Sequence, residues 1–229
     1  MTVDLPSVGC NPPVTTHLGV TAIVRKLLER SIVSECKDVV LIMHSYGGVA
    51  GGGAVSRLEK TARQEAGMEE GVIACVFLAA FLVSKGWGLL GMFDNQFPPY
   101  LAVDPQDEKS LVIIHPTEAF YNDVPADIST PWITSMRPQS YASFQAPVEL
   151  VCWESGLVPC TYVMCDSDSG VYPPLQESMV KEVSEDGRPW IKSSYSVWLS
   201  QPKAVVEAGP QAASEEVSAA RWVMIQSLG

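Results

Sequence analysis

The sequence predicts an α/β fold with a mainly parallel sheet flanked by helices. Residues 39–43 and 71–81 are continuous apolar runs, which are typical of strands buried on both faces of a parallel sheet. A helix is expected over residues 15–30, where apolar residues recur at helical spacing. Residues 158–165 predict a further strand, followed by a turn and a helix over 173–183. Strands that alternate with helices in this way favour a parallel sheet.

The chain of 229 residues can bury a sizeable core, and its texture divides it into segments. Residues 1–83 and 157–208 carry the strand and helix patterns of the core. Residues 84–156 hold most of the aromatic residues and short helical pieces, so we expect a cap insertion that lies over the sheet. Residues 209–229 are expected to form a C-terminal helical tail, because 214–228 have apolar residues at helical spacing. This helix would pack on the domain or on a second copy of the chain, as in a homodimer.

Composition excludes several classes of function. The formal net charge of -11 argues against a nucleic-acid partner and against an anionic membrane surface. No apolar stretch reaches the ~20 residues needed to span a bilayer, and no secretory signal is recognised at residues 1–6. The 6 cysteines follow no zinc or redox spacing. Cys75 and Cys165 lie in apolar strand-like runs as free thiols, so we expect a reduced, cytoplasmic setting. Because phosphate loops and dinucleotide fingerprints are also missing, we expect no cofactor and no metal.

The most specific feature of the chain lies at the end of the first apolar run. That run leads to Ser45, and Gly47 and Gly48 follow it. This order is typical of a nucleophile elbow, in which a buried strand, a sharp turn with the serine at its tip and a helix succeed each other. The turn exposes the serine hydroxyl and aims backbone N–H groups at one point, as acyl transfer requires. We therefore expect Ser45 to line a functional pocket, with Tyr46 beside it on the oxyanion side.

Four blocks of sequence extend this pattern. They are residues 3–9 before the first helix, the elbow at 44–48, the segment 161–168 with Pro173, Pro174 and Gln176, and residues 198–202. Together they resemble the α/β-hydrolase superfamily, specifically the branch of plant methylesterases and hydroxynitrile lyases and their fungal relatives. Residues 120–125 and 138–141 also resemble the cap of the fungal members. The resemblance covers residues 1–208 and implies an α/β-hydrolase fold with a serine, an acid and a histidine at the site.

The chain departs from the family pattern at three places. Met43 stands where the elbow has a leading glycine, which would re-shape the turn slightly. The family's first strand, whose loop supplies one of two oxyanion N–H donors, normally precedes the segment that matches residues 3–5, so the fold is expected to be N-terminally abbreviated. Residues 3–5 would then pair directly with the elbow strand, or a second chain would fill the gap, unless the start is mis-assigned. Tyr195 stands where the catalytic histidine is expected, three residues before Trp198.

These departures disfavour ordinary ester hydrolysis. A phenol has an ordinary pKa of about 10, against about 6.5 for imidazole, so Tyr195 is a poor base at neutral pH. Loss of one oxyanion donor costs roughly a further 3 kcal/mol. Tyr195 can still donate a hydrogen bond that polarises a carbonyl or protonates an enolate. Asp168 matches the family's acid and would accept the phenol's proton; Asp166 is the second candidate, and an Asx-type turn before Pro173 is the structural alternative.

Other polar and aromatic residues are candidates for the same pocket. His44 adjoins the nucleophile, although strand alternation is expected to turn its side chain to the opposite face. His115, in the cap, either hangs over the pocket as a substitute base or is hydrogen-bonded in a loop. Four cap aromatics either line an apolar pocket or form a small core that holds the cap down: Phe120, Tyr121, Trp132 and Tyr141.

The sequence thus predicts an α/β-hydrolase-like enzyme with Ser45, Asp168 and Tyr195 at its site, acting on a small apolar or aromatic carbonyl compound. Ester or lactone hydrolysis and a non-hydrolytic lyase, cyclase or isomerase step both remain open. The family resemblance implies a place in fungal secondary metabolism. The alternative from another class is a catalytically dead pseudo-hydrolase that binds a ligand or a partner protein.

Overall fold

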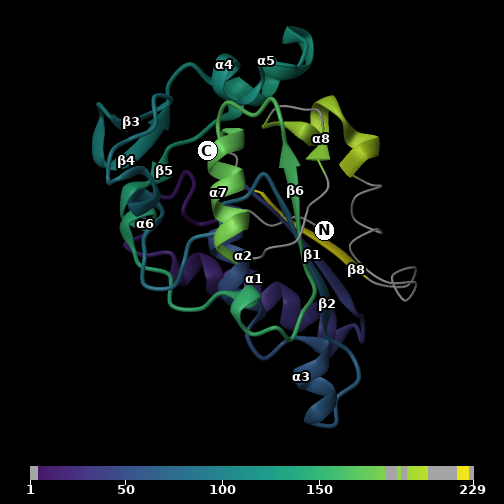
Figure 1. Cartoon of the computed structure of the whole chain (residues 1–229). Coiled ribbons are helices and arrows are strands. Elements are labelled where there is room, and N and C mark those ends of the chain that lie inside the picture. The colour runs from purple at the N-terminus through teal and green to yellow at the C-terminus, as the bar shows by residue number, and fades with distance from the viewer. Residues whose placement is uncertain (1–4, 184–189, 192–194, 206–220, 227–229) are drawn as a thin grey trace.

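The core of the protein is a five-stranded sheet in the order β7-β6-β2-β1-β8, in which every pairing is parallel. The computed structural model in Figure 1 describes residues 5–183, 190–191, 195–205 and 221–226. The mainly parallel sheet expected from the apolar runs is confirmed. Its strands are β1 (Val39–His44), β2 (Val72–Leu78), β6 (Cys160–Cys165), β7 (Trp190–Ile191) and β8 (Arg221–Gln226).

Alternate residues of β1 enter two apolar clusters, one on each face of the sheet. Leu41 and Met43 belong to the larger cluster, to which the helices α1, α2 and α7 contribute. Val40 and Ile42 belong to the smaller cluster, with Val197 of α8. Because both faces are covered, β1 reads as a continuous apolar run rather than an alternating one. The helices of the core are α1 (Leu18–Glu29), α2 (Gly47–Gly52), α3 (Lys60–Glu65), α7 (Pro173–Val183) and α8 (Val197–Ser200), with short turns η1 (Arg30–Ser34), η2 (Gly53–Val55) and η4 (Cys152–Glu154).

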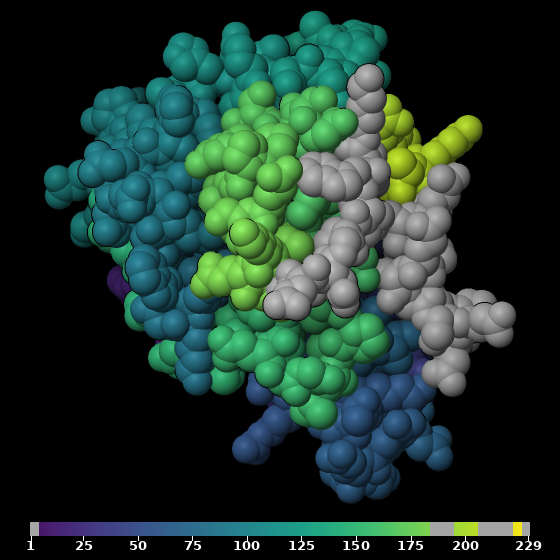
Figure 2. Space-filling view, in the orientation of Figure 1, coloured from purple at the N-terminus to yellow at the C-terminus, as the bar shows by residue number. Residues whose placement is uncertain are grey.

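The expected cap segment builds a second, three-stranded antiparallel sheet in the order β3-β4-β5. The sequence predicted its short helical pieces but missed this sheet, because β4 begins with charged residues and lacks an apolar alternation. In Figure 2 the blue to teal atoms of this region form a continuous layer beside the green helix α7. Its elements are η3 (Leu89–Phe93), β3 (Leu101–Asp104), β4 (Asp107–Ile113), α4 (Pro116–Phe120), α5 (Ala126–Ser135), β5 (Gln139–Ser140) and α6 (Tyr141–Gln145).

The expected C-terminal helix is wrong where the structure describes it, because residues 221–226 form strand β8. This strand pairs in parallel with β1, from Val39 opposite Arg221 to His44 opposite Gln226. Val223 and Ile225 enter the larger cluster, while neighbouring side chains pack on the smaller one. An apolar run that is covered on both faces fits a strand of this parallel sheet as well as a helix, and tertiary pairing decides between them. The rest of the expected helix lies outside the described residues.

Strand β8 also fills the position beside the elbow strand where a gap was expected. β1 has β2 on one side and β8 on the other, so β8 holds the place for which residues 3–5 or a second chain were expected. Figure 1 shows the yellow β8 beside β1, so that a segment near the C-terminal end of the chain lies next to the elbow strand. Residues 3 and 4 lie outside the described residues. Within the described ranges, no helix is long and apolar enough to cross a membrane.

Candidate active site

Ser45 occupies the strained turn that the sequence predicted between β1 and α2. Its φ is 54°, in the left-handed region that non-glycine residues rarely adopt, and its side chain is buried. The carbonyl oxygen of Ser45 accepts hydrogen bonds from the N–H groups of Gly48 (3.1 Å) and Phe81 (3.0 Å). Gly48 must be a glycine here, because a Cβ atom would collide with the carbonyl oxygen of Phe81. These contacts hold the serine at the carboxyl end of the sheet.

Met43, the first departure from the family pattern, is accommodated by a second glycine. Its side chain lies where a Cβ atom of Gly51 would stand, with the sulfur 2.6 Å from that position. The Met43 side chain therefore packs against α2, the helix that follows the elbow. The turn itself keeps the conformation expected of a nucleophile elbow.

Tyr195 lies directly against the serine. Its hydroxyl donates a hydrogen bond to Ser45 Oγ at 2.5 Å, and its ring stacks on Phe120 with centroids 4.0 Å apart. Gly170 makes room for both rings, because a Cβ atom there would stand within 3 Å of each of them. Burial raises the pKa of Tyr195 well above its ordinary value, while the hydrogen bond to Ser45 lowers it. Tyr195 is therefore a protonated hydrogen-bond donor at neutral pH and not a base.

His44 lies on the other face of the sheet, as strand alternation predicted. Its Nε2 atom is 3.1 Å from the carbonyl oxygen of Tyr195, which makes that nitrogen the donor of a hydrogen bond. Burial lowers the pKa of His44 to about 3, against which the bond to that carbonyl acts weakly. Its ring packs edge-on against Tyr195 and Trp198, with centroids 4.5 and 4.3 Å away. His44 is thus a neutral, structural histidine that holds the backbone of residue 195.

Asp168 is buried but makes none of its described hydrogen bonds with Tyr195. Its Oδ1 atom accepts from the N–H groups of Gly170 (2.7 Å) and Val171 (2.9 Å), and Gln176 Nε2 lies 3.5 Å from Oδ2. Burial raises the pKa of Asp168 well above its ordinary value, and the two backbone donors lower it. The expected contact in which Asp168 accepts the phenol's proton is absent from the described bonds, because that hydroxyl donates to Ser45. The Asx-type turn that was the structural alternative is present instead.

Ser45 and Tyr195 open into an apolar cavity of about 520 Å³, counted to its mouth. Most of the wall comes from the cap region, and few polar groups face the space. The lining residues are Ser45, Tyr46, Phe81, Leu90, Phe93, Pro98, Tyr100, Leu101, Ile113, Phe120, Gln139, Phe144 and Tyr195.

The structure separates the remaining candidates. Tyr46 lines the cavity, stacks on Phe144 at 5.3 Å and donates from its hydroxyl to the Ser143 carbonyl oxygen. Four residues predicted to line the cavity are not part of its wall. His115 is exposed before α4, and Tyr121 is buried in the larger cluster. Trp132 is half-buried against that cluster, and Tyr141 packs on Phe97. Asp166, the second candidate for the acid, is exposed and accepts a hydrogen bond from Ser167.

Sequence reasoning missed several residues of the wall, notably Phe93, Tyr100, Gln139 and Phe144. The aromatic richness of residues 84–156 indicated a pocket but could not select its members, because the folding of the cap decides which rings turn inward.

The sequence also gave no sign of a group of three cysteines. Cys75, Cys152 and Cys160 come together within the described part of the chain, although their positions along the sequence follow no zinc or redox spacing.

A parallel sheet covered on both faces, with a serine on a strained turn after a central strand, defines an α/β-hydrolase fold. The chain belongs to the alpha/beta hydrolase family, whose model matches residues 1–208. Its membership of the narrower plant methylesterase branch stays a prediction.

Individual relatives are distant. An alpha/beta hydrolase of Aspergillus novofumigatus, nvfD, is 25% identical over 185 residues, which are 79% of this chain and 71% of that protein. A carbendazim hydrolyzing esterase of Nocardioides is 25% identical over 166 residues, 69% of this chain and 62% of that protein. The crystal structure of polyneuridine aldehyde esterase superposes with a TM-score of 0.67 at 21% identity, covering 90% of this chain and 84% of that one. This structural likeness shows the fold alone.

Proposed function

We propose that this protein binds a small apolar or aromatic carbonyl compound in the Ser45 cavity and promotes a non-hydrolytic step on it. The observation that carries the proposal is the hydrogen bond from the Tyr195 hydroxyl to Ser45 Oγ at 2.5 Å. In a serine hydrolase, the group at this place removes the proton of the serine. Here the Tyr195 hydroxyl is the donor and Ser45 Oγ is the acceptor. The contact therefore does not remove the serine's proton, as activation of a nucleophile requires.

The protonation states of the neighbouring groups support this choice. Burial raises the pKa of Tyr195 and lowers that of His44, so neither group supplies a base for Ser45 at neutral pH. Asp168 is engaged by the backbone of residues 170 and 171. The described site therefore has a hydrogen-bond donor aimed at the elbow and no partner that would make Ser45 attack.

The cavity supports the class of ligand. Rings of Phe81, Phe93, Phe120 and Phe144 make up much of its wall, and such a wall binds apolar and aromatic groups. A carbonyl oxygen that enters beside Ser45 would accept the hydrogen bond of Tyr195, which polarises the carbonyl and stabilises an enolate oxygen. Lyase, isomerase and cyclase steps use such stabilisation. A place in fungal secondary metabolism belongs to this proposal as an inference from the family resemblance.

A second candidate is a binding protein of hydrolase ancestry with no chemistry of its own. The same hydrogen bond favours it, because a phenol whose pKa is raised donates a hydrogen bond more readily than it gives up its proton. The two candidates share the ligand class and differ only in whether the bound compound is converted.

The experiment compares acetophenone, a small ketone that cannot be hydrolysed, with ethylbenzene, which has the same ring without the carbonyl. Calorimetric titration of the wild-type protein and of Tyr195→Phe measures the affinity for each. We expect Tyr195→Phe to weaken acetophenone binding about 5- to 10-fold, the value of one hydrogen bond, and to leave ethylbenzene unchanged.

Equal losses for both compounds would show that Tyr195 only shapes the wall, and no binding of either would contradict the ligand class. Deuterium exchange of the acetophenone methyl group, followed by NMR, separates the two candidates. Exchange that the wild-type protein accelerates, with solvent water taking the methyl proton while Tyr195 stabilises the enolate oxygen, and that is lost in Tyr195→Phe, supports an enolate-forming enzyme. Tight binding without exchange supports the binding protein.

A further inference from the structure

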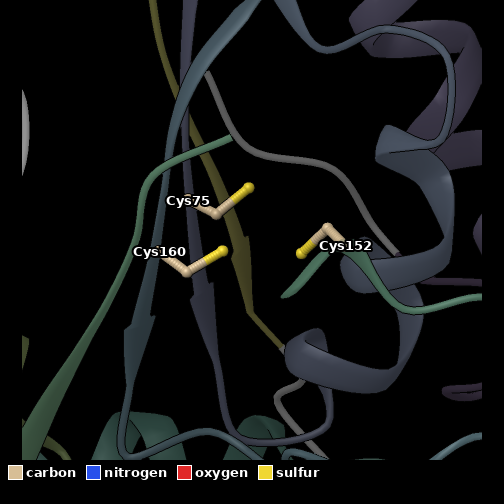
Figure 3. A group of neighbouring side chains, drawn as sticks. All are labelled: Cys75, Cys152 and Cys160. Atoms are coloured by element: carbon tan, nitrogen blue, oxygen red, sulfur yellow. The ribbon is translucent and has the colours of Figure 1, made fainter. Parts of the chain in front are cut away.

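Three cysteine side chains converge on one point inside the protein. Their Sγ atoms all lie within 4.8 Å of one another. Cys75 on β2 and Cys160 on β6 are register partners in adjacent strands, and Cys152 belongs to the turn η4. Figure 3 shows the sulfur atoms of Cys75 and Cys160 turned to the same side of the sheet, with the sulfur of Cys152 facing them.

This cysteine triad lies away from the Ser45 cavity. Cys160 is the first residue of β6, whereas Ser45 follows the last residue of β1, and parallel strands place these positions toward opposite ends of the sheet. None of the three cysteines lines that cavity. Cys75 and Cys152 are buried, and Cys160 is half-buried beside a small recess whose wall includes Phe77 and Trp153. The surroundings are apolar, so the sulfurs are the donor atoms that the site offers.

We propose that the triad of Cys75, Cys152 and Cys160 binds one Cu(I) ion through three sulfur atoms. Soft thiolate ligands select soft ions such as Cu(I), and reject Mg²⁺ and Ca²⁺, which require oxygen donors. With metal–sulfur bonds of about 2.3 Å, as zinc thiolates have, a central ion holds three sulfurs about 4 Å apart. That spacing fits inside the 4.8 Å limit observed here.

The number of donors favours Cu(I) over Zn²⁺. Structural zinc sites are tetrahedral and use four ligands. Among the described residues, the group of His, Cys, Asp and Glu donors at this point contains three members and no fourth.

Proton release accompanies binding. Hydrogen bonds to Cys152 and Cys160, together with burial, raise the pKa of Cys75 well above its ordinary value. The hydrogen bond to Cys160 and burial raise the pKa of Cys152 as well, so these two thiols are protonated at neutral pH. Each thiol that binds as a thiolate gives up its proton to solvent, and affinity therefore rises with pH. The ion would join β2, β6 and η4, and thus fasten the segment that precedes β6 to the sheet.

The test is a titration of the full-length protein, reduced and kept free of oxygen, with Cu(I) supplied as its acetonitrile complex against a chromophoric Cu(I) chelator. Native mass spectrometry counts the copper bound per chain, and X-ray absorption at the copper edge counts its sulfur neighbours. We expect one Cu(I) per chain with three sulfurs. Zn²⁺ in a parallel titration should bind more weakly.

Matched variants assign the site. Cys75→Ala, Cys152→Ala and Cys160→Ala should each weaken Cu(I) binding by at least about tenfold. Cys165→Ala is the control, because Cys165 is buried on the same strand as Cys160 but lies outside the triad; this change should leave affinity for Cu(I) unaltered. If a buried variant does not fold, Cys160→Ser at the half-buried position replaces it, and the rise of Tm with Cu(I) in the wild type, lost in Cys160→Ser, gives the readout.

Failure to take up copper would overturn the proposal, as would uptake that is equal in the wild type and the three variants. Coordination by only two sulfurs, or tighter binding of Zn²⁺ than of Cu(I), would overturn the three-sulfur Cu(I) site. These outcomes are independent of the proposed function, because Ser45 and Tyr195 are left unchanged throughout.

Discussion

His44 and Ser45 are neighbours in sequence, yet they meet opposite sides of the same residue. The Tyr195 hydroxyl donates to Ser45 Oγ on the cavity face of the sheet. On the other face, His44 donates to the Tyr195 carbonyl oxygen. One side therefore bears the features of a reactive centre, a strained serine and an open cavity, while the other is a packed core with a neutral imidazole.

The difference shows how a chain can contain a serine and a histidine side by side and still lack the serine–histidine pair of a hydrolase. Period-two alternation along β1 sends the two side chains apart. His44 then stabilises the backbone of Tyr195 through a hydrogen bond to its carbonyl oxygen. Among the described residues, the elbow turn is present and the side chain that meets Ser45 Oγ is a donor.

The largest predicted effect concerns the His44 side. The pKa of His44 is about 3 in the folded protein and about 6.5 when unfolded. The free energy of unfolding is therefore at its full value above pH 6.5 and falls as the pH drops toward 3, because over that range only the unfolded state takes up a proton at His44. At pH 4 the loss amounts to about 3 kcal/mol. His44→Gln keeps an N–H donor but has no titration. Urea unfolding at pH 7 and pH 4 should therefore show the wild type losing about 3 kcal/mol more than the variant; equal losses would contradict the neutral buried histidine.

A smaller effect is expected from breaking the Ser45 side. Gly48→Ala would place a Cβ atom against the carbonyl oxygen of Phe81, a backbone atom that cannot move away without disturbing the hydrogen bonds of Ser45. Overpacking of this kind typically costs about 1–3 kcal/mol. Gly19→Ala, at an open position of α1, is the control and should not destabilise the protein. Thermal unfolding measures both, and an unchanged Tm in Gly48→Ala would show that the elbow is looser than described.

The smallest effect isolates the link between the two residues. A double-mutant cycle with Ser45→Ala, Tyr195→Phe and the double variant measures their coupling in free energy of unfolding. We expect about 1 kcal/mol, the usual net value of a buried hydrogen bond. Zero coupling would mean that the hydroxyls of Ser45 and Tyr195 do not interact in solution.

The sequence predicted those parts of the fold that depend on local pattern. The apolar run before Ser45 gave β1 and the elbow, and residues 173–183 gave α7 because the prolines mark its start. The position of Tyr195 opposite Ser45 followed from the family order of blocks. These features need only short stretches of chain, or a known arrangement, to be read correctly.

Long-range partners decided the rest. β8 pairs with a strand about 180 residues earlier, and its apolar run fits a helix as well as a strand. The folding of the cap determines which rings line the cavity, and β4 of its antiparallel sheet begins with charged residues that hide the strand in the sequence. Asp168 could accept hydrogen bonds from a side chain or from the nearby backbone, and the N–H groups of residues 170 and 171 both donate to its Oδ1 atom. No local signal distinguishes these outcomes.

In the described site Ser45 accepts a hydrogen bond from Tyr195 and has no base beside it, and the rate at which a fluorophosphonate labels Ser45 is the direct test of this arrangement. Intact mass spectrometry would follow the wild type and Tyr195→His, with Ser45→Ala as the blank. We predict negligible labelling of the wild type and at least about 10²-fold faster labelling of Tyr195→His, since a positioned general base contributes that much. Wild-type labelling at Ser45 as fast as that of Tyr195→His would reveal another base and would contradict the account.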